Sequence, residues 1–315
     1  MVGTVVLALL AGCASKDDTA ALMNPDPPDK MFAAADKRLA MGSYSEAARK
    51  FEELDRDHPY APEARRAMVM AAYAYYKGGK YPEAIAAARR YTTLHPGTKE
   101  AALAHHIIAS ANFDEIKTPN RDQTATRKAL AELKLLRDRY PDSPYTRQAE
   151  NRIKIAEDIL AASEMEVGRF YLKKNNHLAA INRFKVVVSE YQTTLHVEEA
   201  LYRITESNMA LGVVPEAQAA AAVLGHNYPD SQWYKDSYAL LKSGGVSPQT
   251  SAGGWFSNIF KPAAKPAPAP TPQKVPDGLP SPEQLPSPRV PGSDIPTAST
   301  NGGKPPFGLG LGRGA

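Results

Sequence analysis

One spacing recurs five times in this chain, and it constrains the fold more than any other feature. An alanine is followed twelve residues later by a proline in four copies and by a glutamine in the fifth. The five pairs are Ala47/Pro59, Ala84/Pro96, Ala129/Pro141, Ala180/Gln192 and Ala217/Pro229. Small or apolar residues follow each alanine at four and seven positions, which places three side chains on one helical face. The proline then ends the helix, because its ring cannot continue the turn.

A second apolar-periodic segment precedes each of these helices. Gly42, Gly79 and Asn175–Asn176 occupy the turn between the two segments, and both residue types suit a left-handed backbone at a helix end. The repeating unit is therefore helix, turn, helix. The alanines of two pairs of adjacent copies are 37 residues apart, close to the tetratricopeptide period of about 34. We expect an all-α, tetratricopeptide-like solenoid of five helix-turn-helix repeats.

Local details of the repeats support this expectation. One copy matches four tetratricopeptide signature positions, namely Gly168, Tyr171, Ala180 and Phe184. Two copies are stretched, and we expect a loop near Asp114 to Asp122 and one long helix from about Tyr145 to Lys174. A final helix, Ser231 to Lys242, is expected to cover the apolar face of the last repeat, as the ends of solenoids require.

Proline usage marks where the folded part of the chain ends. Residues 244–315 hold 15 of the 27 prolines, and alternating Pro-Ala favours extended backbone without a packed core. We expect a signal peptide at 1–12, a linker at 13–28, repeats one to three at 29–142, repeats four and five with the capping helix at 143–243, and a disordered tail at 244–315.

Cys13, the only cysteine, follows an apolar run that ends in Leu10-Ala11-Gly12. That run is too short to span a bilayer and fits a secretory signal with a small-residue cleavage site. The order Leu-Ala-Gly-Cys resembles a bacterial lipobox, which implies cleavage before Cys13 and a lipid on its sulfur. The alternative is a buried core cysteine. No basic residue precedes the apolar run, so we expect the signal to be incomplete at its start.

Composition and motifs exclude several functional classes. The net charge is only +4 and no run of five basic residues occurs, so nucleic acid is not indicated. We find no catalytic constellation, metal site or nucleotide loop, and we expect a non-enzymatic protein without a cofactor. A binding surface is the better expectation, because stacked helical pairs form a long concave face.

The stretch Tyr73-Ala74-Tyr75-Tyr76 lies on the first helix of the second repeat. Tyrosine rings offer a large contact area at low entropy cost, so Tyr73, Tyr75 and Tyr76 are candidates for a peptide-binding groove. Each of the three can instead pack between helices as part of the core. A second apolar cluster, Trp255 to Phe260, is either a short docking motif in the tail or a fragment without a partner.

The combined features resemble the BamD family, the tetratricopeptide lipoproteins of the outer-membrane β-barrel assembly machine. Besides the lipobox and the stretched repeats, three local sequences are similar: Ala74 to Lys77, Arg139 to Tyr145, and Asn182 to Phe184. The resemblance covers about residues 25–242.

That resemblance implies a scaffold on the periplasmic face of the outer membrane, held by its lipid. Its N-terminal repeats would receive unfolded barrel proteins, and its C-terminal repeats would contact BamA and other subunits of the machine. Arg183 would be a charge facing BamA, or else a solvated arginine. The competing hypothesis is a periplasmic lipoprotein adaptor that recruits peptidoglycan hydrolases or proteases.

Overall fold

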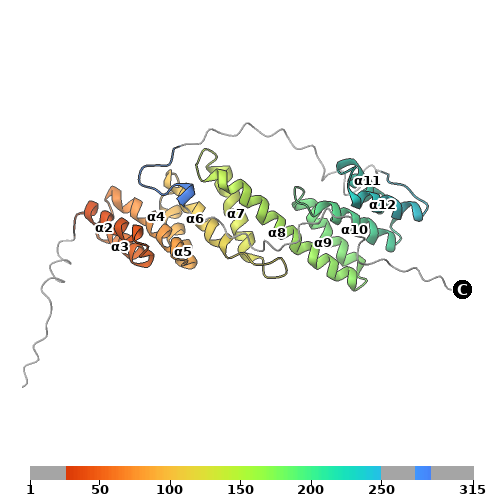
Figure 1. Ribbon diagram of the computed structural model, residues 1–315, viewed down its shortest axis with the longest axis horizontal. Coiled ribbons are helices and arrows are strands. Elements are labelled where there is room, and N and C mark those ends of the chain that lie inside the picture. The colour runs from red at the N-terminus through yellow and green to blue at the C-terminus, as the bar shows by residue number, and fades with distance from the viewer. Residues whose placement is uncertain (1–25, 250–273, 285–315) are drawn as a thin grey trace, which may run out of the picture. The chain divides into compact units, whose positions relative to one another are not determined.

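A computed structural model describes residues 26–249 and 274–284 of the chain (Figure 1). Within these ranges it contains eleven α-helices and no strand, which confirms the all-α prediction. The helices are α2 (Pro28–Ala40), α3 (Tyr44–Asp57), α4 (Pro62–Lys77), α5 (Tyr81–Leu94), α6 (Glu100–Asp114), α7 (Thr124–Arg139), α8 (Thr146–Lys173), α9 (His177–Glu190), α10 (Val197–Ala210), α11 (Val214–Asn227) and α12 (Gln232–Ser243).

The five second helices are α3, α5, α7, α9 and α11, and each ends two residues before its proline or, in α9, before Gln192. The predicted inner face of these helices is confirmed at every position. All fifteen side chains are 0% exposed: Ala47, Phe51, Leu54, Ala84, Ala88, Tyr91, Ala129, Leu133, Leu136, Ala180, Phe184, Val187, Ala217, Ala221 and Leu224. The alanine spacing therefore identifies the buried face of each second helix.

The turns within repeats depend on residues that tolerate a positive φ. Gly42, Gly79 and Gly212 have φ values of 78°, 70° and 75°, and Asn175 takes the equivalent place with 56°. In the described part of the chain Asn175 is the sole non-glycine residue with a positive φ. The predicted loop between α6 and α7, the 28-residue α8 and the terminal helix α12 are all present.

The described chain forms two compact units. Unit 1 comprises helices α2 to α5, α6 as far as Ala111, and the segments Arg139–Tyr145 and 274–284. Unit 2 comprises the end of α6, α7 as far as Asp138, and α8 to α12. This division differs from the predicted grouping at residue 142, because most of α7 belongs with α8.

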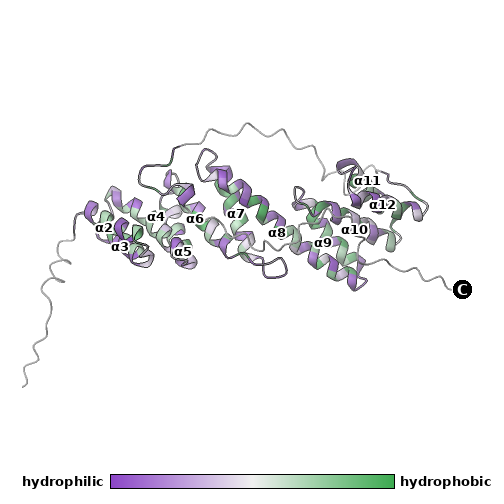
Figure 2. Ribbon diagram, in the orientation of Figure 1, coloured by the Kyte–Doolittle hydropathy of each residue, from purple (hydrophilic) through white to green (hydrophobic). Residues whose placement is uncertain are grey.

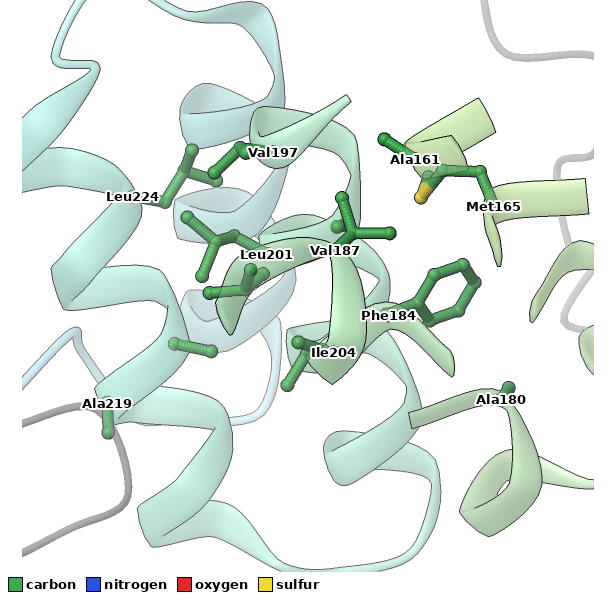
Figure 3. Packing of buried hydrophobic residues seen from close by; sticks show 13 residues of the cluster. Ala161, Met165, Ala180, Phe184, Val187, Val197, Leu201, Ile204, Ala219 and Leu224 are labelled. Carbon is green, nitrogen blue, oxygen red and sulfur yellow. The ribbon is translucent and has the colours of Figure 1, made fainter. Parts of the chain in front are cut away.

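Unit 2 contains a large apolar cluster built from α8 to α11 (Figure 3), and Ala217, Ala221 and Leu241 form a second, smaller one. In the large cluster Phe184 of α9 packs with Met165 of α8, while Leu201 of α10 and Leu224 of α11 extend the same cluster. Gly168 explains why α8 and α9 approach so closely: a Cβ atom at this position would lie 2.7 Å from Cζ and 2.9 Å from Cδ1 of Phe184. The signature glycine is required by this packing.

In unit 1, helices α2 to α5 each pack on the next in sequence. Phe32 and Phe51 join α2 to α3 with ring centroids 5.2 Å apart, and Arg90 of α5 forms a 2.7 Å ion pair with the buried Asp55 of α3. Most helices carry both hydrophilic and hydrophobic residues along their length (Figure 2). Residues 101–111 of α6 are all buried, as expected for a helix without a polar face.

Part of the range predicted to be disordered has a defined structure. Residues 274–284, here called the strap, run beside α4 and α6 (Figure 1). They form a turn in which Leu279 N–H donates to the Pro276 carbonyl at 3.2 Å, and they end in a short 3-10 helix, Pro282–Gln284. Backbone carbonyls of the strap bond to other parts of unit 1, as described below. Among the described helices, none is long and apolar enough to cross a membrane.

Candidate functional site

The strap is held on unit 1 by side-chain donors that meet its backbone carbonyls. Arg66 Nη2 of α4 donates to the carbonyl oxygen of Gly278 at 3.2 Å, and Tyr145 Oη donates to that of Pro280 at 2.8 Å. Tyr73 Oη and Lys77 Nζ both reach the Gln284 carbonyl, at 3.3 and 3.5 Å. We call the surface formed by these four donors the strap surface. Its donors bond to backbone carbonyl oxygens rather than to a particular side chain.

Apolar contacts complete the strap surface. Leu279 of the strap is 9% exposed and Pro280 is buried, beside Tyr73 and Tyr145, which are 6% and 1% exposed. A cavity of about 180 Å³ continues from the strap and is lined by Lys99 before α6, Ala102 of α6, residues 139–145, Lys274 and Pro276. The cavity shows that the strap leaves part of this surface unfilled.

The phenol groups of this surface are protonated well beyond neutral pH. Desolvation, reinforced by the nearby Tyr44, raises the pKa of Tyr73 to about 12. Burial likewise raises the pKa of Tyr145 well above its usual value of 10. Both hydroxyls are therefore protonated at neutral pH and can donate to a carbonyl oxygen.

The three tyrosines that the sequence singled out do not share one surface. Tyr73 belongs to the strap surface. Tyr76 is 2% exposed and lies near Tyr81, with ring centroids 6.0 Å apart, so it packs between helices as part of the core. Tyr75 is partly exposed, and its hydroxyl donates to Glu52 at 3.0 Å beside a separate cavity of about 300 Å³. Burial and this hydrogen bond raise the pKa of Tyr75 to about 12.

Sequence reasoning missed the other donors of the strap surface. Arg66, Lys77 and Tyr145 belong to no sequence motif that indicates binding. Tyr145 is, however, the last residue of the stretch Arg139 to Tyr145, which resembles the BamD family. The strap was not predicted because it is rich in proline. Proline content indicates a lack of core-forming residues, but it does not indicate whether a segment docks on another part of the chain. Cys13 and the cluster Trp255 to Phe260 lie outside the described residues.

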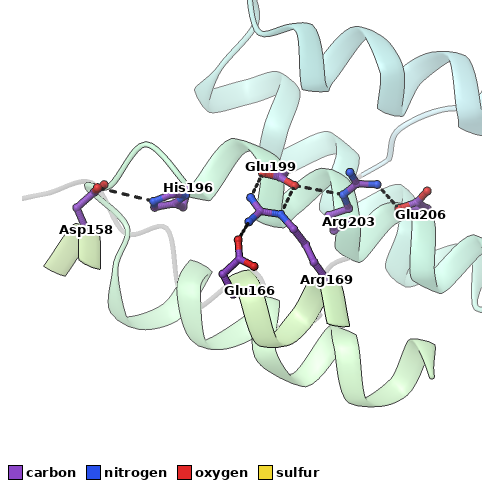
Figure 4. A network of polar contacts seen from close by, with 7 residues as sticks. All are labelled: Asp158, Glu166, Arg169, His196, Glu199, Arg203 and Glu206. Carbon is purple, nitrogen blue, oxygen red and sulfur yellow. Dashed lines mark hydrogen bonds and ion pairs between the residues drawn. The ribbon is translucent and has the colours of Figure 1, made fainter. Parts of the chain in front are cut away.

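Unit 2 carries a charged network on α8 and α10 (Figure 4). Arg169 binds both carboxylate oxygens of Glu199, through Nε at 3.0 Å and Nη2 at 2.5 Å, and Arg203 Nε lies 3.4 Å from the same carboxylate. Glu166 and Glu206 pair with the outer nitrogens of the two arginines. Burial opposes ionisation of Glu199, but the hydrogen bonds and charges of Arg169 and Arg203 outweigh it and lower its pKa.

Arg183 projects from α9 with a 45% exposed side chain. Its Nη1 lies 3.2 Å from Oε2 of Glu164 on α8, so part of its charge is already neutralised within unit 2. The pair joins two helices, and the exposed part of the guanidinium can still meet a partner. In the described residues, no three His, Cys, Asp or Glu side chains are placed to hold a metal ion.

Fold and site together define a helical-repeat protein of the tetratricopeptide type, with a surface that binds a segment of the same chain through its backbone carbonyls. Residues 24–224 match the YfiO family, described as outer membrane lipoproteins, and the chain belongs to this family.

Curated relatives agree with that assignment. "Outer membrane protein assembly factor BamD" of Caulobacter vibrioides is 41% identical over 245 residues, which cover 78% of this chain and 80% of the relative. The proteins of the same name from Rickettsia prowazekii and Neisseria meningitidis serogroup A are 36% and 31% identical. These alignments cover 76% and 72% of this chain and 94% and 91% of those relatives.

Proposed function

We propose that this protein is a non-enzymatic, lipid-anchored scaffold of the outer-membrane β-barrel assembly machine, which helps to recognise and insert unfolded barrel proteins. The observation that carries the proposal is the family match over residues 24–224, together with relatives named as outer membrane protein assembly factors. The helical-repeat fold supports it, since such folds present long surfaces for other proteins.

The anchor in this proposal is a lipid on Cys13, followed by the linker 13–28. Sixteen residues span at most about 55 Å when fully extended, so the repeats stay near the periplasmic face of the outer membrane. A diacyl-type anchor carries more than one chain, which favours stable attachment. Clients and partners are then also found close to that membrane.

Unfolded barrel proteins are the proposed clients of unit 1. The strap surface supports this role because its donors bond to backbone carbonyls, which every extended segment offers. Leu279 shows that the same surface also buries an apolar side chain. Such a combination suits a receptor for many different sequences, whereas a receptor that reads one motif would need side-chain-specific polar contacts.

BamA and the other subunits are the proposed partners of unit 2. Arg183 is our candidate contact, because almost half of its side chain remains exposed beside Glu164. The charge on α9 would meet an acidic or carbonyl group of the partner.

Co-purification tests the proposed function. The full-length chain with an affinity tag is recovered from detergent-solubilised outer membranes, and the bound proteins are identified. The proposal predicts recovery of BamA. Recovery of peptidoglycan hydrolases or proteases without BamA would support the adaptor hypothesis instead.

Two variants separate a partner contact at Arg183 from a purely internal ion pair. Arg183→Glu should lower BamA recovery, because it reverses the exposed charge. Glu164→Gln breaks the same ion pair from the other side and should leave recovery unchanged. Equal effects of the two substitutions would assign Arg183 to the stability of unit 2 alone.

A further inference from the structure

The strap occupies its surface through backbone carbonyl groups, which a client segment also carries. Three of its carbonyl oxygens, from Gly278, Pro280 and Gln284, accept hydrogen bonds from unit 1. With the strap in place, Tyr73 and Tyr145 are almost completely buried. A second segment cannot reach these two hydroxyls until the strap leaves.

One strap residue makes the docked conformation possible. Gly278 has a φ of 77°, a backbone region that favours glycine. A Cβ atom here would also collide with the Arg66 guanidinium, lying 2.7 Å from its Cζ and closer still to Nη2. Any larger residue at 278 therefore opposes docking twice, through backbone strain and through the loss of the Arg66 hydrogen bond.

We propose that the strap, residues 274–284, is a displaceable internal occupant of the client-binding surface on unit 1 and competes with unfolded barrel segments for it. This inference rests on the proposed function, in which unit 1 receives those clients. The strap then acts as an autoinhibitory contact: a client binds only when it replaces the carbonyls and the apolar side chain that the strap supplies.

Covalent linkage makes this competition effective. Residue 274 is joined to residue 249 by only 24 intervening residues, and a tethered segment reaches an effective concentration on the order of millimolar at its site. The apparent association constant for a client equals its intrinsic value multiplied by the fraction of time that the surface is open. A strap docked for about nine-tenths of the time weakens client binding about tenfold.

Two probes test the proposal on the full-length protein. The first is a fluorescein-labelled synthetic peptide of residues 272–286, and the second is a urea-unfolded outer-membrane β-barrel protein diluted into the assay. Dissociation constants are measured for the wild-type chain and for Gly278→Val. We expect both probes to bind the variant about tenfold more tightly, and we expect excess peptide to displace the barrel protein.

Asp277→Ala is the matched control, because the Asp277 side chain is 97% exposed and next to Gly278. This variant should bind both probes as the wild type does. Adding Tyr145→Phe to Gly278→Val removes one donor from the surface and should weaken both probes together. Circular dichroism should give unchanged helix content for all variants.

The outcomes separate this proposal from the proposed function. If the barrel protein binds the wild type and Gly278→Val equally well, the competition is refuted while client binding stands. A Tyr145→Phe effect on the peptide alone would place clients elsewhere and refute it as well. Absence of client binding in every variant would refute client recognition by this chain, and the competition with it.

Discussion

Substitution of Gly168 by alanine tests whether the repeats are held together by the close packing of α8 on α9. The new Cβ would lie less than 3 Å from three ring carbons of Phe184. That ring is 0% exposed and is enclosed by the apolar cluster of unit 2, so it cannot swing into solvent. Either the ring or the helix must therefore move.

The expected cost follows from two opposing effects. Overpacking a well-filled core costs about 1–3 kcal/mol, and alanine regains about 1 kcal/mol of helix propensity relative to glycine. Because the Phe184 ring is fully enclosed, the overpacking cost lies in the upper part of this range, about 2–3 kcal/mol. We therefore expect Gly168→Ala to lower the free energy of unfolding by about 1–2 kcal/mol. Urea denaturation followed by far-UV circular dichroism measures this change, and hydrogen exchange assigns it to α8 and α9.

A double-mutant cycle tests the stated cause. Phe184→Leu removes the ring that the new methyl group meets, so Gly168→Ala should cost much less in that background, with a coupling of about 1 kcal/mol. Gly225→Ala is the matched control: its Cβ would meet Tyr234, whose ring is partly exposed and can move aside. A Gly168→Ala protein as stable as the wild type, or a cost unchanged by Phe184→Leu, would refute the reasoning.

Other substitutions probe the turns, the charged network and the anchor. Asn175→Gly should leave stability unchanged or slightly higher, because φ is 56° there, whereas Asn175→Val should cost about 1–2 kcal/mol in thermal unfolding. Glu199→Gln removes the more buried of the two carboxylates that pair with Arg169 and should cost about 2 kcal/mol, while Glu166→Gln, on a 57% exposed residue, should cost less than about 0.5 kcal/mol. Since the folded-state pKa of Glu199 lies below its ordinary 4.5, its stabilisation is complete above pH 4.5 and is lost as the pH falls through the folded-state pKa, so Glu199→Gln should flatten the acid limb of a pH–stability curve. Cys13→Ala should keep its helical circular dichroism and move from the membrane to the soluble fraction after cell lysis, and continued membrane retention would argue against the lipid anchor.

Much of the repeat architecture was predictable because it depends on local rules. Helix periodicity places Ala180, Phe184 and Val187 on one face, and the structure buries all three. A positive φ at a helix end favours glycine or asparagine, so the turn at Asn175 could also be predicted from the sequence. These features involve residues that are close together in the chain.

The candidate site was harder to predict because its parts are distant in sequence. Tyr73 and Gln284 are 211 residues apart, and Tyr145 and Pro280 are 135 apart. Composition indicates that the proline-rich tail lacks core-forming residues, but it cannot reveal donors on another element. Periodicity alone also could not decide which of the neighbouring tyrosines faces the strap.

The central claim is that the protein serves barrel assembly at the outer membrane, and controlled depletion of the chain tests it most directly. Folded outer-membrane barrel proteins are quantified by their heat-dependent migration on gels as the protein disappears from the cell. We predict that folded barrel proteins decline, that inner-membrane proteins keep their levels, and that a wild-type copy restores the barrels. Normal levels of folded barrel proteins in fully depleted cells would contradict the account.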